Sequence, residues 1–76
     1  MSIRIILSDP KGKLKAIRVN RDDLIKTCKE NSGYSPASKW RWTFDGYILE
    51  NDKTIKDYDL EEDDNIICSE EVIGGK

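Results

Sequence analysis

Apolar and polar residues alternate in two segments near the start of the chain, and this pattern predicts a β-hairpin. The segments cover residues 2–7 and 14–19, and their apolar residues recur at every second position: Ile3, Ile5 and Leu7 in the first, Ile17 and Val19 in the second. Residues 8–13 contain a proline and a glycine, which are typical of a turn. Lys15 falls on the inward-facing phase of the second segment, so we expect this strand to lie at a sheet edge or to be irregular near its start.

The next segment predicts a helix of about three turns that ends near Asn31. Asn20 is a candidate N-cap, and Asp23 stands three residues later, where a capping box places an acidic side chain. Gly33 supplies the stop after the helix. The expected buried stripe consists of Leu24, Ile25 and Cys28.

Three aromatic rings at alternate positions predict a strand that buries one side: Trp40, Trp42 and Phe44. Asp45-Gly46 is a hairpin-turn signal before a short strand over residues 47–49. Residues 51–59 form a loop with a packed turn, and an acidic run at 61–64 precedes the last strand over 65–69. The predicted order is β-β-α-β-β-β, in one α+β domain.

Composition excludes several classes of protein. The 76 residues are 37% hydrophobic and 37% charged with a net charge of −2, which is typical of a soluble globular domain and not of a nucleic-acid binder. No segment approaches the roughly 20 apolar residues of a membrane span, and residues 1–7 do not form a signal peptide. We therefore expect a cytoplasmic or nuclear protein that acts as a monomer, without nucleic-acid or membrane partners.

The chain contains no histidine, the residue most often used as a general base. Cys28 and Cys68 match no disulfide framework or metal motif, and both fall on inward-facing positions. We expect no enzymatic activity, no catalytic residue, no metal and no cofactor.

Motifs in the second half of the chain resemble the ubiquitin-like family. These are Phe44-Asp45-Gly46, Leu49-Glu50, Thr54, Asp57-Tyr58 and Gly74-Gly75, which keep the spacing of ubiquitin without a gap. The resemblance implies a β-grasp fold, with a mixed sheet of four to five strands on one helix, in which Leu49 and Ile55 fill the core and the Tyr58 hydroxyl holds a loop. It also implies a domain over residues 1–73 and a flexible tail at 74–76.

Within this family the chain looks more like SUMO, because it carries the acidic run 61–64 and acidic residues before the diglycine. Thr43 and Ser69 stand where ubiquitin carries aliphatic residues of its receptor-binding patch, and Tyr47 replaces its principal chain-linking lysine. Glu71 stands where ubiquitin has an arginine that its activating enzyme reads, so the reversed charge is expected to exclude that enzyme.

Two functions of different classes follow from the resemblance. The first is a conjugated modifier: a protease removes Lys76, an activating enzyme adenylates Gly75, and a conjugating enzyme delivers the Gly74-Gly75 tail to a substrate lysine. Glycines lack a Cβ and can pass through a narrow enzyme tunnel. Lys76 is equally compatible with an arbitrary boundary or with continuation into a longer chain.

The second is a non-conjugated interaction domain of a larger protein, and the native sequence beyond Lys76 would distinguish the two. A sulfur carrier with a C-terminal thiocarboxylate is a third hypothesis, which Lys76 disfavours.

Either function would use a partner groove between the second strand and the helix. SUMO-like proteins add an extended apolar peptide at this sheet edge. Five basic residues would frame the groove and pair with acidic residues of the peptide: Lys13, Lys15, Arg18, Lys26 and Lys29. The alternative is that they form a solvated basic surface.

Overall fold

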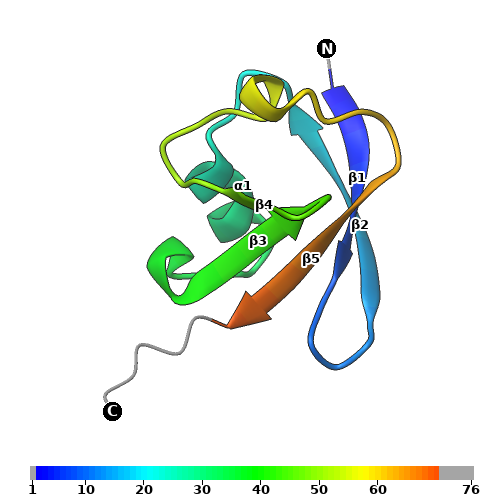
Figure 1. Ribbon diagram of the computed structural model, residues 1–76, viewed down its shortest axis with the longest axis vertical. Helices are drawn as coiled ribbons and strands as arrows, with labels where there is room; N and C mark the ends of the chain where they lie inside the picture. Colours follow the sequence, from blue (N-terminus) through cyan, green and yellow to red (C-terminus); the bar gives the residue numbers. More distant parts are fainter. Residues whose placement is uncertain (1, 71–76) are drawn as a thin grey trace.

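The computed structural model describes residues 2–70 of the chain. Its elements, in chain order, are β1 (Ser2–Ser8), β2 (Leu14–Asn20), α1 (Ile25–Asn31), the 3₁₀ turn η1 (Ala37–Lys39), β3 (Trp40–Phe44), β4 (Tyr47–Leu49), the 3₁₀ turn η2 (Lys56–Tyr58) and β5 (Asp64–Glu70). Figure 1 shows them in the predicted order β-β-α-β-β-β.

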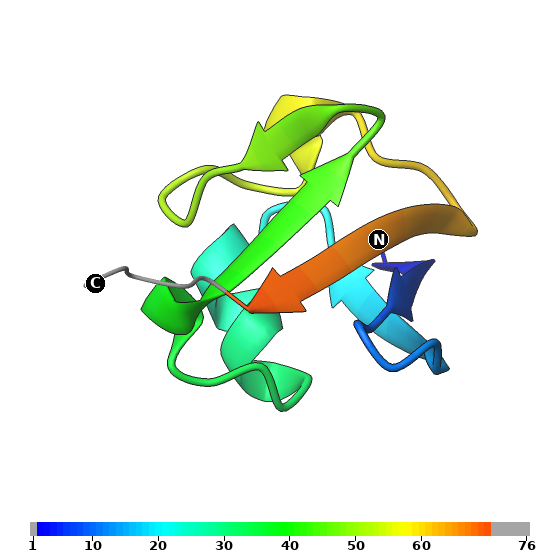
Figure 2. The same cartoon turned by 60° about the horizontal axis from the view of Figure 1, so that its bottom comes forward.

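The five strands form one mixed sheet in the order β2-β1-β5-β3-β4. β1 and β5 are parallel, whereas the other neighbours are antiparallel. α1 packs against one face of this sheet, as Figures 1 and 2 show from two directions. A mixed sheet on one helix confirms the predicted α+β, β-grasp class, with β2 and β4 as the two edges.

The core lies between α1 and the sheet, and it contains the apolar residues that the alternation placed inward. Its fully buried members include Ile5, Leu7, Ile25, Trp42, Leu49, Ile55, Leu60 and Ile66. Because successive strand residues point to opposite faces, a single face of the sheet supplies most of this cluster. The predicted core roles of Leu49 and Ile55 are confirmed.

The helix begins later than the sequence predicts. The Asn20 N–H donates to Asp23 Oδ2 at 3.0 Å, but this pair closes a turn and not the first turn of the helix. The N-cap is Leu24, which is 37% exposed and therefore lies outside the buried stripe. The prediction was wrong because residues 21–25 pair with another segment, residues 53–56.

Hydrogen bonds between these two segments replace the missing helical bonds. Lys56 N–H donates to Arg21 O at 2.9 Å, and Ile55 N–H donates to Asp23 O at 3.1 Å. Leu24 and Thr54 form an isolated β-bridge. The first backbone groups after β2 are thus satisfied without a helix.

Two tyrosines, Tyr34 and Tyr58, fix two of the loops. Tyr34 is buried and packs edge-to-face on Trp40, with ring centroids 4.7 Å apart, so the loop at 34–38 contributes to the core. The Tyr58 hydroxyl accepts a hydrogen bond of 2.8 Å from Glu50 N–H, which confirms that Tyr58 holds the loop after β4.

Candidate functional site

The described structure ends at Glu70, which is paired with Trp40 at the end of the β3–β5 ladder. The predicted conjugation and processing residues, Gly74, Gly75 and Lys76, and the predicted specificity residue Glu71 lie outside the described residues. The proposed division at 73/74 lies there as well. Their roles stay predictions.

The groove between β2 and α1 is a small hollow of about 70 Å³. Its lining residues are Ile17, Arg18, Val19, Asp23, Cys28, Asn31 and Ser32. Lys15 lies beside this hollow, because its Nζ donates to the Ser32 carbonyl at the end of α1 at 2.6 Å. A cation at a helix C-terminus is favourable, so Lys15 ties the edge strand to the helix.

The backbone of β2 is arranged to accept a further strand. Asp9 N–H donates to Lys13 O at 3.0 Å, which makes residues 9 and 13 a hydrogen-bonded pair at the start of the β1–β2 ladder. Such pairs alternate along an antiparallel ladder. The register therefore turns the backbone groups of Leu14, Ala16 and Arg18 toward the edge that no described strand covers.

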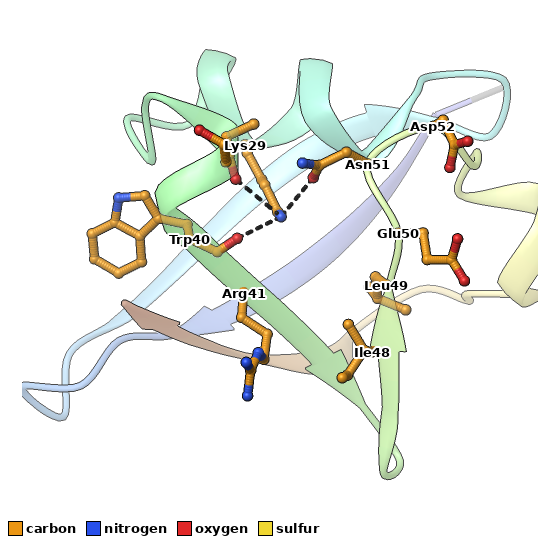
Figure 3. A pocket seen from close by; sticks show the side chains of 10 residues that line it. Lys29, Trp40, Arg41, Ile48, Leu49, Glu50, Asn51 and Asp52 are labelled. Carbon is orange, nitrogen blue, oxygen red and sulfur yellow. Dashed lines mark hydrogen bonds between the residues drawn. The ribbon is translucent and has the colours of Figure 1, made fainter. Parts of the chain in front are cut away.

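Two of the five predicted groove residues are corrected. Lys29 is only 2% exposed, and its Nζ donates to Trp40 O at 2.6 Å and to Asn51 Oδ1 at 2.7 Å, as Figure 3 shows. The flexible four-carbon stem carries this ammonium toward β3 and the loop after β4, away from β2. Lys26 is exposed near the start of α1, where its own N–H donates to Asn51 O, and it is absent from the groove lining.

The structure thus brings Arg18 and Lys15 to the groove. Lys13 is exposed at the end of the β1–β2 turn, just before β2. Lys26 and Lys29 belong to the neighbourhood of Asn51.

The sheet face opposite α1 carries apolar surface that the sequence analysis missed. Thr43 is paired with Ile48 on one side and Ile67 on the other, and these two side chains are 55% and 58% exposed. The signal was present in the consecutive Ile66 and Ile67, since only one of two neighbours in a strand can face the core. Although Thr43 itself is polar, the centre of this face therefore carries exposed apolar side chains on both sides of it.

A second, larger hollow lies beside β4, at the other edge of the sheet. It measures about 340 Å³ and is lined by Lys29, Ala37, Ser38, Trp40, Arg41, Ile48, Leu49, Glu50, Asn51 and Asp52. Figure 3 shows Lys29 at its base, reaching toward Trp40 and Asn51, with Ile48 and Leu49 on the opposite wall.

Part of the acidic run holds β1. Arg4 Nε donates to Asp63 Oδ1 at 2.7 Å, and Arg4 N–H donates to Glu62 Oε1 at 3.0 Å. This hydrogen bond from Arg4 lowers the pKa of Asp63 below its usual value. The loop before β5 therefore has a structural role at the start of the sheet.

Neither cysteine is placed for nucleophilic chemistry. Cys28 and Cys68 are 2% and 1% exposed, and burial raises the pKa of each thiol to about 12. A reactive thiolate needs an accessible and electropositive environment. Among residues 2–70, no group of three or more histidine, cysteine, aspartate or glutamate side chains could hold a metal ion. None of the described helices has the length and apolar character to cross a membrane.

Comparison with known proteins gives one family. The family model described as "Ubiquitin family" matches residues 3–72, which is most of the chain. No curated protein matches the chain.

Proposed function

Because the chain belongs to the ubiquitin family, whose members are generally non-enzymatic modifiers or domains, we propose that it is a SUMO-like protein modifier conjugated through Gly75. The observation that carries this proposal is the diglycine itself. Only Glu71, Val72 and Ile73 stand between the last strand of the domain and Gly74-Gly75. A protease removes Lys76 to expose the Gly75 carboxylate.

The chemistry of conjugation belongs to the partner enzymes. The activating enzyme adenylates the Gly75 carboxylate with ATP and releases diphosphate, and its cysteine then displaces AMP to form a thioester. The lysine amine of the substrate attacks the thioester after transfer to the conjugating enzyme, which forms an isopeptide bond and releases the thiol. This chain contributes a tail without side chains at the reacting end.

Glu71 sets the choice of activating enzyme in this proposal. A carboxylate replaces the arginine of ubiquitin at this position. A pocket that is acidic in order to bind arginine would repel Glu71, and this repulsion separates the two conjugation systems.

A thioester assay tests the proposal. The chain trimmed at Gly75 is incubated with ATP and the SUMO-type activating enzyme of the same organism, and a band that a reducing agent removes is expected. The Gly75→Ala variant and a reaction without ATP serve as negative controls. Absence of the band, while a competent modifier is activated in parallel, would contradict the proposal.

The second candidate function is a non-conjugated interaction domain of a larger protein. The exposed Ile48 and Ile67 on either side of Thr43 favour it, because these two large apolar side chains lie on one face of the sheet, where a partner could bury them. A native sequence that continues well beyond Lys76 would support this function, and a stop codon at or near Lys76 would support the modifier.

Under either function we propose that β2 binds an extended peptide with apolar and acidic residues. The backbone groups of Leu14, Ala16 and Arg18 supply main-chain hydrogen bonds for an added strand. Every second side chain of the peptide would lie over the hollow that Ile17 and Val19 line. Acidic residues of the peptide would pair with Arg18, Lys13 and Lys15, each exposed pair contributing about 0.2–1 kcal/mol.

A chemical-shift titration with an acidic, β-branched peptide tests this binding mode. Amide shifts are expected along residues 13–20 and on the α1 residues that line the hollow. Arg18→Glu should weaken binding, whereas Lys26→Glu should leave it nearly unchanged, because Lys26 is exposed but absent from the groove lining. A titration without shifts at residues 13–29 would exclude the groove.

A further inference from the structure

The two edges of the sheet carry opposite charge. Basic residues follow the β2 edge and the turn before it: Lys11, Lys13, Lys15 and Arg18. Acidic residues flank the β4 edge: Asp45, Glu50 and Asp52. Since β2 and β4 are the first and last strands of one sheet, the charges lie at opposite ends of the same molecule.

Each edge also exposes large apolar side chains. Leu14, the first residue of β2, is 69% exposed. On β4, Tyr47 and Ile48 are 67% and 55% exposed. Three of the five exposed large apolar side chains in residues 2–70 therefore lie on the two edge strands, where strands could be added.

On β4, one residue, Ile48, directs its backbone N–H and C=O toward the outer edge of the sheet. Asp45 and Gly46 form a two-residue turn with φ angles of 54° and 85°, so Phe44 and Tyr47 close the hairpin. Hydrogen-bonded pairs alternate along the ladder, which directs the N–H and C=O of Ile48 away from β3. On β2 the same reasoning directs those of Leu14, Ala16 and Arg18 outward.

The hollow beside β4 could receive an apolar side chain from the β2 edge of another copy. Its volume of about 340 Å³ and its apolar lining from Ala37, Ile48 and Leu49 provide room for an aliphatic side chain. Glu50 and Asp52 lie on the rim, as Figure 3 shows.

We propose that the chain associates head to tail with itself: the β2 edge of one copy docks on the β4 edge of the next. The backbone of Ile48 pairs with that of Ala16, which continues the sheet from one copy into the other. Leu14 enters the hollow, and Lys13, which precedes β2 and is exposed, faces Asp52 and not Arg41, which also lines the hollow. Pairing of two β2 edges is disfavoured, because it would bring the lysines of both copies together.

This contact joins two different surfaces, so it leaves a second pair of edges available on every dimer. Such contacts build open filaments, or rings when the rotation closes. One backbone pair, Ile48 with Ala16, and one inserted side chain make a small interface, which places the affinity in the range of weak and transient contacts. The contact uses the β2 edge but not Gly75, so it is independent of conjugation.

Dilution of the full chain tests the proposal. Two-dimensional ¹H–¹⁵N spectra and sedimentation velocity are recorded from about 20 μM to about 1 mM, the range in which a weak contact is populated. We expect concentration-dependent shifts at residues 13–18 and at 45–52 together, with a rising sedimentation coefficient. Higher salt should weaken the association because the paired charges are exposed.

Variants distinguish this geometry from other contacts. Leu14→Ser should weaken association about tenfold, because it removes the inserted side chain. Ile67→Ser is the matched control: Ile67 is 58% exposed on β5, away from both edges, and the variant should associate like the original chain. Lys13→Glu and Asp52→Lys should each weaken association roughly threefold or more, and the double variant should recover it.

Three results of the dilution and variant experiments would overturn the proposal. They are an absence of concentration dependence up to about 1 mM, shifts confined to one of the two edges, and loss of association in Ile67→Ser. An acidic extended peptide that binds β2 should dissociate the assembly. A peptide that binds β2 and leaves the assembly intact would contradict the shared edge.

Discussion

Lys29 illustrates how a single side chain can link segments that are distant in the sequence. Its ammonium donates to carbonyls of Ala37 and Trp40 and to the Asn51 side chain, and it thereby joins α1, η1, β3 and the loop after β4. A charge at 2% exposure persists only when such acceptors surround it. This lysine therefore acts in the structure of the domain and not in its basic surface.

Replacement of Lys29 by methionine tests this role. Lys29→Met keeps much of the volume but leaves the acceptors at Trp40 and Asn51 without their donor, so we expect a loss of about 2–4 kcal/mol in the free energy of unfolding. Urea denaturation measures it. Lys26→Met is the matched control, and the exposed position predicts a change within about 0.5 kcal/mol. Equal effects of the two substitutions would show that Lys29 does not hold these segments together.

Burial of the two thiols has two measurable consequences: the native chain is alkylated slowly, and its free energy of unfolding depends on pH. Burial raises the pKa of Cys28 and Cys68 from 9.0 to about 12, so the folded state binds more protons than the unfolded state between these values. The stabilisation is complete below pH 9 and is lost as the pH rises toward 12.

We expect alkylation of the native chain at pH 8 to proceed only through unfolding, as mass spectrometry can follow. Rapid alkylation without denaturant would contradict the buried placement.

At the scale of elements, local patterns predict the strands well and the helix boundary poorly. Alternation placed Ile5, Leu7 and Trp42 inward correctly, because strand periodicity depends only on neighbours in the sequence. The helix start depends on a distant segment, because the backbone groups after β2 form hydrogen bonds with residues 53–56. No local sequence pattern predicts this pairing. The capping-box residues Asn20 and Asp23 bonded as expected but closed a different turn.

The same distinction applies to the groove. Arg18 and Lys15 reach it because strand phase and edge position are readable from the sequence. Lys26 and Lys29 do not, because the loop after β4 packs on their side of α1: Lys29 Nζ donates to Asn51 Oδ1 and Lys26 N–H donates to Asn51 O, contacts that no local pattern specifies. Ile48 and Ile67 lie on either side of Thr43 only because β3 pairs with β4 on one side and with β5 on the other, and a local pattern does not specify this pairing.

The turn between β3 and β4 gives a test at this scale. Asp45 and Gly46 both have positive φ angles, and nothing lies within 4 Å of a Cβ built on Gly46. The cost of Gly46→Ala therefore comes from the backbone alone, and we expect about 1–2 kcal/mol in the free energy of unfolding. Asp45→Asn should be close to neutral, because asparagine tolerates this conformation. A neutral Gly46→Ala would indicate that the turn adopts another geometry.

At the scale of the whole molecule, the sheet has three surfaces with different chemistry. The β2 edge is basic, the β4 edge is flanked by acidic residues, and the face opposite α1 exposes Ile48 and Ile67 around Thr43. A modifier needs such surfaces, because its partners must recognise the folded domain after the tail has been joined to a substrate.

The sequence of the tail makes conjugation directly measurable. No lysine or arginine lies between Lys56 and Lys76, so trypsin would leave a branch of residues 57–75 on a modified lysine. A protease that cleaves after glutamate would instead cut at Glu71 and leave the short branch Val72-Ile73-Gly74-Gly75. The second digest converts a conjugate into a compact mass signature.

The most direct test is therefore mass spectrometry of proteins from the native cells after cleavage at glutamate. The account predicts lysines of other proteins that carry Val-Ile-Gly-Gly through an isopeptide bond, and it predicts their absence when Gly75 is replaced by alanine. Two findings together would contradict the account. All of the protein would be recovered unconjugated and with Lys76 still attached, and no branched peptide would be found in a digest that does detect the branch of another modifier.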